Sequence, residues 1–348
     1  MSSAAPNAPQ YTSALWSGAC PYDDVIDVRA PCEFAEDRIP GAVNLPVLSD
    51  AQRAEVGTLY REHGGFPARK LGAAYVSANI ARHLSEHFAT KGKDYRPFVY
   101  CWRGGQRSAS LALVLAQIGW RVSVLRGGYK TYRAHVMREL ESVPPRFALR
   151  VVVGATGTGK TRLLRALAAR GAQVLDLEAL ANHRGSALGA VGAQPPQKWF
   201  DSQLLAALNG FDPARPVWAE GESNRIGDVY LPRALWDRMR GAEVLELRAS
   251  LEARVRALLE DYAPLCADAE ALKAKLLPFA RRHGLRQVEA WCAAVDAGAW
   301  EPFVASLLAV HYDPAYTASA KRTYPTVSRV LDAGNAPVEA LAAELHAG

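Results

Sequence analysis

Short apolar runs alternate with amphipathic segments over the first 140 residues. The strand-like runs are residues 23–29, 41–46, 96–101 and 120–129, and the helix-period segments are residues 71–88 and 108–119. Strands that alternate with helices in this way predict an open, mainly parallel sheet, and therefore an α/β domain. Ligands of such sheets bind at the carboxyl ends of the strands, where this chain places Asp27, Cys101 and Arg126.

The pattern is interrupted at residues 142–146, which contain two prolines, and it then starts again. We therefore expect a first domain at residues 11–141 and a second at residues 146–250. The second domain opens with an apolar strand at residues 149–153, followed by a glycine-rich stretch and a helix. After residue 250 the apolar positions recur with helical period, which predicts a helical region at residues 251–348 packed on the second domain.

The composition is that of a globular protein. Of the 348 residues, 49% are hydrophobic and 22% are charged, and no apolar run approaches the ~20 residues that span a bilayer. The five cysteines are scattered and form no CxxC pair, which argues against a disulfide framework and a zinc site. We therefore expect a cytoplasmic protein with no membrane association, no resident metal centre and no tightly bound cofactor, apart from a magnesium ion that a bound phosphate would bring. The net charge of +6 weakly favours the binding of polyanionic partners.

A single cysteine begins the first candidate site. Cys101 follows an apolar strand and opens a loop that contains Arg103, Gly104, Gly105 and Arg107, after which a helix begins. A strand, a tight loop and a helix gather backbone N–H groups around one centre, and the helix N-terminus and both arginines favour a thiolate. We therefore predict that Cys101 is catalytic and that the arginines and glycine amides bind an oxyanion.

The spacing within this loop leaves two kinds of chemistry open. Cys101 and Arg107 enclose five residues, the spacing with which phosphotyrosine phosphatases surround a tetrahedral oxyanion, whereas a loop for a bound sulfur atom needs one residue fewer. Cys101 is therefore either a nucleophile toward phosphate or a chalcogen carrier with an enlarged loop. A phosphatase also needs a general acid, for which Asp27 is the candidate. The spacing favours Arg107 for the main oxyanion contact.

A glycine-rich loop forms the second candidate site. Residues 154–161 match the full Walker A pattern and lie between a predicted strand and a predicted helix. The residues expected to bind phosphate are Gly154, Thr156, Gly157, Thr158, Gly159, Lys160 and Thr161. Lys160 should reach the terminal phosphates, and the Thr161 hydroxyl should hold a magnesium ion. The loop does not distinguish ATP from another diphosphate-bearing molecule.

Charged residues that follow two further strands are expected near the Walker A loop, in contact with phosphate or with metal-bound water. They are Asp176, Glu178, Arg184, Glu220, Glu222 and Arg225. Carboxylates at strand ends beside a P-loop commonly hold a metal or its waters, and arginines stabilise phosphate charge. Aromatic and basic residues also mix at 311–316 and 321–324. This mixture indicates either RNA binding or a turn with buried tyrosines and a solvated basic face.

Several segments resemble known families. They are residues 27–44, 125–129, 175–189, 194–198, 222–227 and 312–316. The first two resemble the opening and closing signatures of rhodanese domains. With the cysteine loop and the Walker A loop, the whole set resembles bacterial tRNA 2-selenouridine synthases over nearly the full chain. The resemblance implies an N-terminal rhodanese-like domain with an open, mainly parallel sheet, then a P-loop NTPase-like α/β domain with a helical C-terminal region.

The resemblance also implies a reaction. The family replaces sulfur by selenium in wobble 2-thiouridine of tRNA, with selenophosphate as donor and a thiouridine geranylated from geranyl diphosphate as intermediate. Cys101 would carry selenium as a selanyl-cysteine, and Arg103, Arg107 and the glycine amides would hold the selenophosphate oxyanion. The Walker A loop would bind geranyl diphosphate. The implied partners are the anticodon arm of tRNA and, transiently, the enzyme that produces selenophosphate.

Two other hypotheses remain open on the residues alone. One is an ATP-dependent kinase or ATPase fused to a rhodanese-fold sulfurtransferase or phosphatase. The other is a redox-sensing module in which Cys101 regulates a nucleotide-binding protein. Cys32, in the opening rhodanese signature, is either a resolving thiol or a small buried residue, and Gly221 after Glu220 leaves the role of that glutamate undefined.

Overall fold

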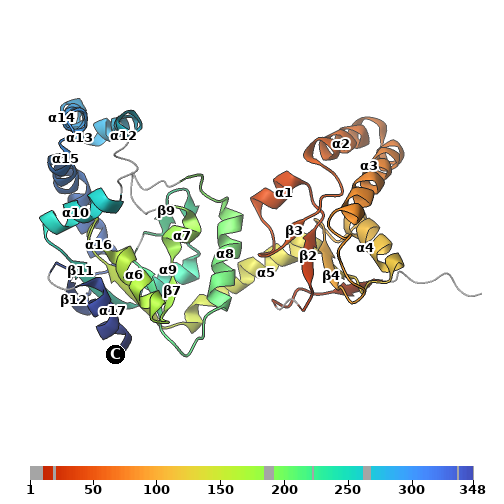
Figure 1. Ribbon diagram of the computed structural model, residues 1–348, viewed down its shortest axis with the longest axis horizontal. Helices are drawn as coiled ribbons and strands as arrows, with labels where there is room; N and C mark the ends of the chain where they lie inside the picture. The colour runs from red at the N-terminus through yellow and green to blue at the C-terminus, as the bar shows by residue number, and fades with distance from the viewer. Residues whose placement is uncertain are drawn as a thin grey trace, which may run out of the picture. The chain divides into compact units, whose positions relative to one another are not determined.

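The computed structural model describes residues 11–18, 21–183, 192–221, 223–261, 268–334 and 337–347 (Figure 1). The chain divides into two compact units. The first comprises Met1–Leu140 with Pro195–Ala206, and the second comprises Glu141–Gln194 with Ala207–Gly348. The division at residue 140 lies close to the boundary expected from the two prolines.

A five-stranded parallel sheet forms the centre of the first unit. Its strands in spatial order are β1 (Thr12–Ala14), β5 (Ser123–Leu125), β4 (Pro97–Tyr100), β2 (Asp24–Asp27) and β3 (Val43–Asn44). Every residue of β4 is buried, as expected for a central strand that is covered on both faces. The sheet confirms the predicted α/β fold with parallel strands.

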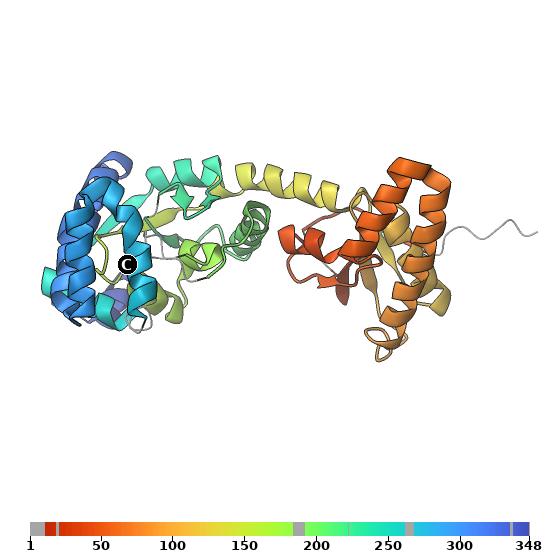
Figure 2. The ribbon, with the colours of Figure 1, turned by 90° about the horizontal axis from the view of Figure 1, so that it is seen from above.

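Helices connect the later strands of this sheet and follow its last strand. They are α1 (Pro31–Glu36), α2 (Asp50–His63), α3 (Gly65–Ser85), α4 (Gln106–Ile118) and α5 (Gly128–Ser142), and the short turn η1 (Pro144–Arg146) follows. α2 begins with a capping box of Ser49 and Gln52, and α2 packs against α3 as an antiparallel pair (Figure 2). α4 ends at Gly119, whose φ of 111° is a left-handed cap that favours glycine.

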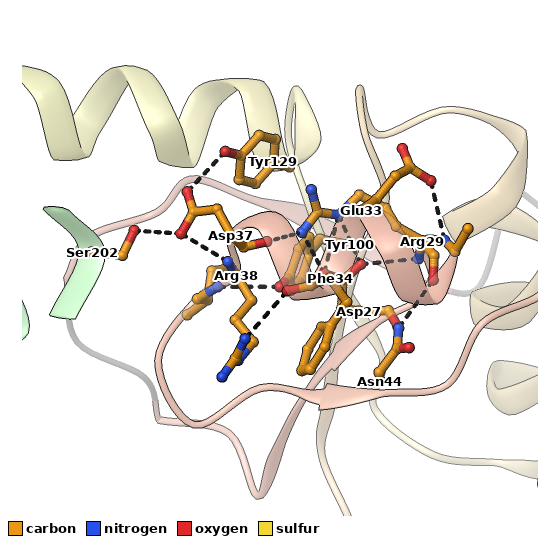
Figure 3. Close-up of polar contacts among 12 residues, drawn as sticks. Asp27, Arg29, Glu33, Phe34, Asp37, Arg38, Asn44, Tyr100, Tyr129 and Ser202 are labelled. Atoms are coloured by element: carbon orange, nitrogen blue, oxygen red, sulfur yellow. Dashed lines mark hydrogen bonds and ion pairs between the residues drawn. The ribbon is translucent and has the colours of Figure 1, made fainter. Parts of the chain in front are cut away.

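A segment from the second half of the sequence completes the first unit. The start of α8 (Gln197–Asn209) belongs to Pro195–Ala206, which we expected in the second domain. The Ser202 hydroxyl donates to the Asp37 carboxylate at 2.7 Å (Figure 3). Asp37 is fully buried, and burial raises its pKa although hydrogen bonds from Ser202 and Tyr129 oppose the rise. The segment therefore donates a hydrogen bond to a buried carboxylate of the first unit. The helical periodicity of the sequence does not predict this contact.

A second parallel sheet of five strands forms the centre of the second unit. Its strands in spatial order are β12 (Arg329–Asp332), β11 (Glu243–Arg248), β6 (Leu149–Val153), β8 (Val217–Glu220) and β7 (Gln173–Leu175). β9 (Arg225–Ile226) and β10 (Val229–Tyr230) form a separate antiparallel pair. β12 was not expected, because it lies in the region whose pattern is otherwise helical.

Helices make up most of the rest of the second unit. They are α6 (Lys160–Ala169), α7 (Leu177–Ala181), α9 (Arg233–Arg240), α10 (Leu251–Asp261), α12 (Ala269–Leu276), α13 (Ala280–His283), α14 (Leu285–Asp296), α15 (Trp300–Leu307), α16 (Asp313–Thr323) and α17 (Val338–Ala347), with the single turns η2 (Leu277–Phe279) and η3 (Leu308–Tyr312). α17 packs with α6 on the sheet, whereas α12, α14 and α15 enclose a core of their own. None of the described helices has the length and apolarity needed to span a membrane.

We predict that replacing Asp201 on α8 destabilises the first unit. Asp201 is 5% exposed and accepts hydrogen bonds from Arg133 at 2.5 Å and from Gln197 at 2.8 Å. Asp201→Ala leaves a partly buried guanidinium without this partner, which should cost about 1–3 kcal/mol of unfolding free energy in urea titrations. Lys198→Ala on the same helix removes an exposed ion pair with Glu36 and should cost less than about 1 kcal/mol. Equal losses would contradict this role for Asp201.

Candidate active sites on two loops

The cysteine loop starts where β4 ends and stops where α4 begins. Cys101 is 3% exposed. The Gly105 N–H donates to Cys101 Sγ at 3.2 Å, and the Ser108 hydroxyl lies 3.1 Å from the same sulfur. The first turn of α4 contains no acidic residue. The sulfur therefore lies among hydrogen-bond donors at the positive end of a helix.

Glycines allow this loop to pack tightly on the closing signature. A Cβ at Gly128, whose φ is +62°, would lie 2.3 Å from the Cys101 carbonyl oxygen. One at Gly104, with φ +67°, would lie 2.9 Å from the Leu125 carbonyl oxygen. The Tyr129 N–H donates to the Cys101 carbonyl at 2.8 Å. The carbonyl at the head of the loop is thus turned toward the N-terminus of α5.

The two arginines of the loop have different surroundings. Arg107 donates to Glu33 at 2.8 Å and 3.4 Å. Burial works to raise the pKa of Glu33, but the Arg107 guanidinium and the Ala30 N–H outweigh it and hold that pKa below its usual value. Arg103 is exposed and has no ion-pair partner among the described residues. Glu33 thus fixes Arg107 beside the loop, while Arg103 is available to an anion from solvent.

Asp27 does not have the geometry of a general acid. Its carboxylate is fully buried and accepts from Arg29 at 2.6 Å and 3.0 Å (Figure 3). The same guanidinium donates to the Asp37 carbonyl at 2.6 Å and lies 4.0 Å from the centre of the Tyr129 ring. The prediction of Asp27 as a catalytic acid is therefore corrected: this aspartate and Arg29 form a buried structural pair.

Cys32 is exposed, so the expectation of a small buried residue is wrong. Its N–H donates to the Asp50 carboxylate at 3.0 Å. The same carboxylate raises the pKa of the Cys32 thiol, which disfavours the thiolate that a resolving cysteine needs.

The Walker A loop joins β6 to α6. Gly159, with φ +89°, precedes the first residue of α6, Lys160. The Lys160 ammonium donates to the Gly154 carbonyl at 2.7 Å, and the Thr158 hydroxyl donates to the Ala155 carbonyl at 2.9 Å. The lysine thus lies folded over its own loop, where a phosphate oxygen could replace the carbonyl as its partner.

Hydrogen bonds link three residues with oxygen-bearing side chains near the start of α6. The Thr161 hydroxyl donates to Glu178 at 3.3 Å, and Glu220 accepts from the Glu178 N–H at 3.2 Å. Glu220 is 1% exposed. A hydroxyl and two carboxylates are the oxygen ligands that Mg²⁺ prefers, so these residues fit the predicted magnesium ion. Gly221 has a packing role, because a Cβ there would lie 2.4 Å from Val153 Cγ1.

A buried arginine supports the Walker A loop from the helical region. Arg254 on α10 is 7% exposed, and its Nε donates to the Thr156 carbonyl at 2.8 Å. Its terminal nitrogens donate to Asp313 at 3.1 Å and 2.5 Å. Tyr316, on the same helix as Asp313, lies beside the Gly154 N–H, and burial and then Glu246 raise its pKa to about 12. The helical region therefore positions the backbone of the Walker A loop.

Comparisons with known proteins assign a family to each half of the chain. A family model described as tRNA 2-selenouridine synthase AAA domain matches residues 147–276, and a rhodanese-like domain model matches residues 10–135. The tRNA 2-selenouridine synthase of Bdellovibrio bacteriovorus is 33% identical over 345 residues, which cover 87% of this chain and 90% of that protein. This chain belongs to the tRNA 2-selenouridine synthase family.

Other members of the family match to different extents. The enzyme of Alcanivorax borkumensis is 34% identical over 87% of this chain and 91% of its own length. That of Nitrosomonas europaea is 39% identical, but the match covers 68% of this chain and only 63% of the relative, less than two thirds of its length.

Two of the charged residues predicted near the Walker A loop have local roles instead. Asp176 is the N-cap of α7 and accepts from the Ala179 N–H at 2.8 Å. Arg225 donates to the Gly227 carbonyl at 2.6 Å within its own β9–β10 pair. Such short-range partners follow from turn geometry, which a list of acids and bases does not show. Of the remaining four, Glu178 and Glu220 lie beside Thr161 as described above, and Arg184 and Glu222 lie outside the described residues.

The aromatic and basic residues near the C-terminus make internal contacts. His283 Nε2 lies 2.8 Å from His311 Nδ1. Burial and then the neighbouring His283 lower the pKa of His311 to about 4. Tyr324 is buried and lies edge-on to Trp236. These contacts favour the interpretation as packed side chains over RNA binding.

Sequence analysis did not single out four residues that support the two loops: Glu33, Ser108, Arg254 and Asp313. The sequence does indicate that Arg254 is unusual. It lies on the same helical face as Leu251, Val255 and Leu258, where an apolar residue is expected. A charged residue at such a position is buried with a partner, but the pattern does not say which one.

We predict that Arg254→Ala weakens binding of inorganic pyrophosphate to the Walker A loop. The Thr156 carbonyl loses a charged donor worth roughly 1.5–3 kcal/mol, so the dissociation constant measured by calorimetry should rise about tenfold or more. Asp313→Asn should weaken binding in the same direction. The matched control Arg256→Ala changes an exposed residue of the same helix and should leave affinity unchanged. Unchanged affinity in folded Arg254→Ala protein would contradict this role.

Proposed function

We propose that this protein replaces sulfur by selenium in 2-thiouridine at the wobble position of tRNA, with selenophosphate as selenium donor and a geranylated thiouridine as intermediate. The observation that carries the proposal is the pair of anion-binding loops in one chain, one built around Cys101 and the other around Lys160. Family relatives carry the name tRNA 2-selenouridine synthase. Two loops match the two anionic co-substrates of such a reaction.

The Walker A loop would bind the diphosphate of geranyl diphosphate. Lys160 would exchange the Gly154 carbonyl for a phosphate oxygen, and the backbone N–H groups of the loop would bind the remaining oxygens. When the thiouridine sulfur attacks the geranyl carbon, charge develops on the departing diphosphate, and the same groups stabilise it. A magnesium ion held by Thr161, Glu178 and Glu220 would supply further positive charge to the diphosphate.

The cysteine loop would bind selenophosphate next to the nucleotide. Trp102 is 36% exposed and stands directly after Cys101, and its ring lies 5.2 Å from that of Tyr129. An exposed, supported indole can stack on an unpaired base such as the wobble uridine. Arg103 and Lys130 are exposed and have no ion-pair partner among the described residues, so they are available to phosphates of the anticodon arm.

We predict that the two loops fail separately when each is altered. Purified Cys101→Ser protein, given tRNA that contains 2-thiouridine, geranyl diphosphate and selenophosphate, should accumulate geranylated thiouridine and form no selenouridine. Lys160→Ala protein should form neither product, because the diphosphate is no longer held. Mass spectrometry of the digested nucleosides measures both.

Two results would count against this proposal. Unimpaired geranylation by Lys160→Ala would remove the Walker A loop from the mechanism. ATP hydrolysis that does not need tRNA, together with no change in the nucleosides, would favour an ATPase fused to a rhodanese-fold domain.

A further inference from the structure

We propose that Cys101 is a phosphoryl acceptor, which attacks the phosphorus of a selenium-bound phosphoryl group and so releases selenium for the base. This inference rests on the proposed function and names the step that the cysteine performs. The phosphoryl group belongs either to free selenophosphate or to selenophosphate already joined to the nucleotide. The bond that breaks, phosphorus to selenium, is the same in both.

The loop has the parts that phosphoryl transfer requires. Five residues separate Cys101 from Arg107, enough backbone to surround the three oxygens of a phosphoryl group. Arg107 has five N–H donors, of which Glu33 takes two, so the others remain for an oxyanion. The Gly105 N–H at the start of α4 donates to the sulfur, and the N–H groups of the first turn of α4 can stabilise the charge of the transferring phosphoryl group.

The surroundings of the loop suit a leaving group that needs no proton. Asp27 is buried against Arg29, and Glu33 is held ionised by Arg107, so neither carboxyl can serve as a general acid. An alkoxide leaving group would need such an acid. Selenium does not, because selenols are far stronger acids than alcohols and depart as anions at neutral pH. With these two carboxyls unable to donate a proton, the loop suits a selenium-bound phosphoryl group better than an alkyl phosphate.

Electron counting separates this step from a selenium carrier. A thiolate and selenophosphate can form a sulfur–selenium bond only if two electrons are removed. They would pass either to an oxidant, which neither the proposed reaction nor its co-substrates provide, or to phosphorus, which would leave as phosphite, a far poorer leaving group than a selenolate. In phosphoryl transfer the thiolate pair forms the sulfur–phosphorus bond, and the phosphorus–selenium pair leaves on selenium. Water then attacks phosphorus, releasing inorganic phosphate and the thiolate, so every atom and electron is accounted for.

Ser108 is placed to assist the second half of this cycle. It is fully buried, its hydroxyl lies 3.1 Å from Cys101 Sγ, and it can donate to the Gly105 carbonyl at 3.1 Å. When water attacks the phosphorus, the sulfur leaves as a thiolate, and a hydroxyl at this distance can donate to it. Without that donor the phosphorylated cysteine should persist longer.

Double labelling tests the proposal. Full-length protein is mixed with selenophosphate labelled with radioactive phosphorus or with radioactive selenium, quenched with denaturant and separated from small molecules. We expect phosphorus on the protein and no selenium. Ser108→Ala should retain at least about tenfold more phosphorus label at steady state. Ser110→Ala changes a half-buried serine of the same helix, whose hydroxyl donates to the Gln106 carbonyl, and should match the wild type. Cys101→Ser should retain none.

The outcomes are distinguishable from a failure of the proposed function. Selenium on Cys101 without phosphorus would overturn the proposal and establish a selanyl-cysteine carrier, while selenouridine could still form. Absence of both labels in wild type and Ser108→Ala, in protein that still makes selenouridine, would also overturn it. Adding geranylated tRNA separates the two sources: label that appears only then comes from selenophosphate already joined to the nucleotide. Protein that makes no selenouridine under any condition would count against the proposed function itself.

Discussion

Backbone N–H groups gathered at the start of a helix are the interaction on which both sites depend. Each site follows the last residue of a parallel strand, β4 or β6, and ends at the first turn of the next helix, α4 or α6. At the first site the Gly105 N–H donates to the sulfur of Cys101, and at the second the Lys160 side chain folds over the loop that precedes the helix. Anion binding at either loop would therefore rest on the backbone, with side chains adding selectivity.

A backbone loop that binds an anion needs its carbonyl oxygens to have other hydrogen-bond partners. The two units supply these partners in different ways. In the first unit the N-terminus of α5 donates to the Cys101 carbonyl, and close glycine contacts make the approach possible. In the second unit the Arg254 side chain donates to the Thr156 carbonyl and is itself held by Asp313. The Arg254 side chain from the helical region thus binds a carbonyl of the Walker A loop, as the N-terminus of α5 binds a carbonyl of the cysteine loop.

The sequence allowed both loops to be predicted, because cysteine, glycine, arginine and lysine at fixed spacings form local structure that needs few long-range contacts. Residues whose roles depend on distant partners were misjudged. Asp27 was taken for a catalytic acid although Arg29 neutralises it, and residues 195–206 were assigned to the second domain although Ser202 serves Asp37. Burial and partner choice are set by tertiary packing, which neither periodicity nor spacing encodes.

The central claim, that the two loops perform successive steps on one tRNA base, is tested most directly by mass spectrometry of wobble nucleosides from cells with and without the gene. The account predicts that deletion removes both selenouridine and geranylated thiouridine and leaves 2-thiouridine in their place. An unchanged nucleoside profile would contradict it.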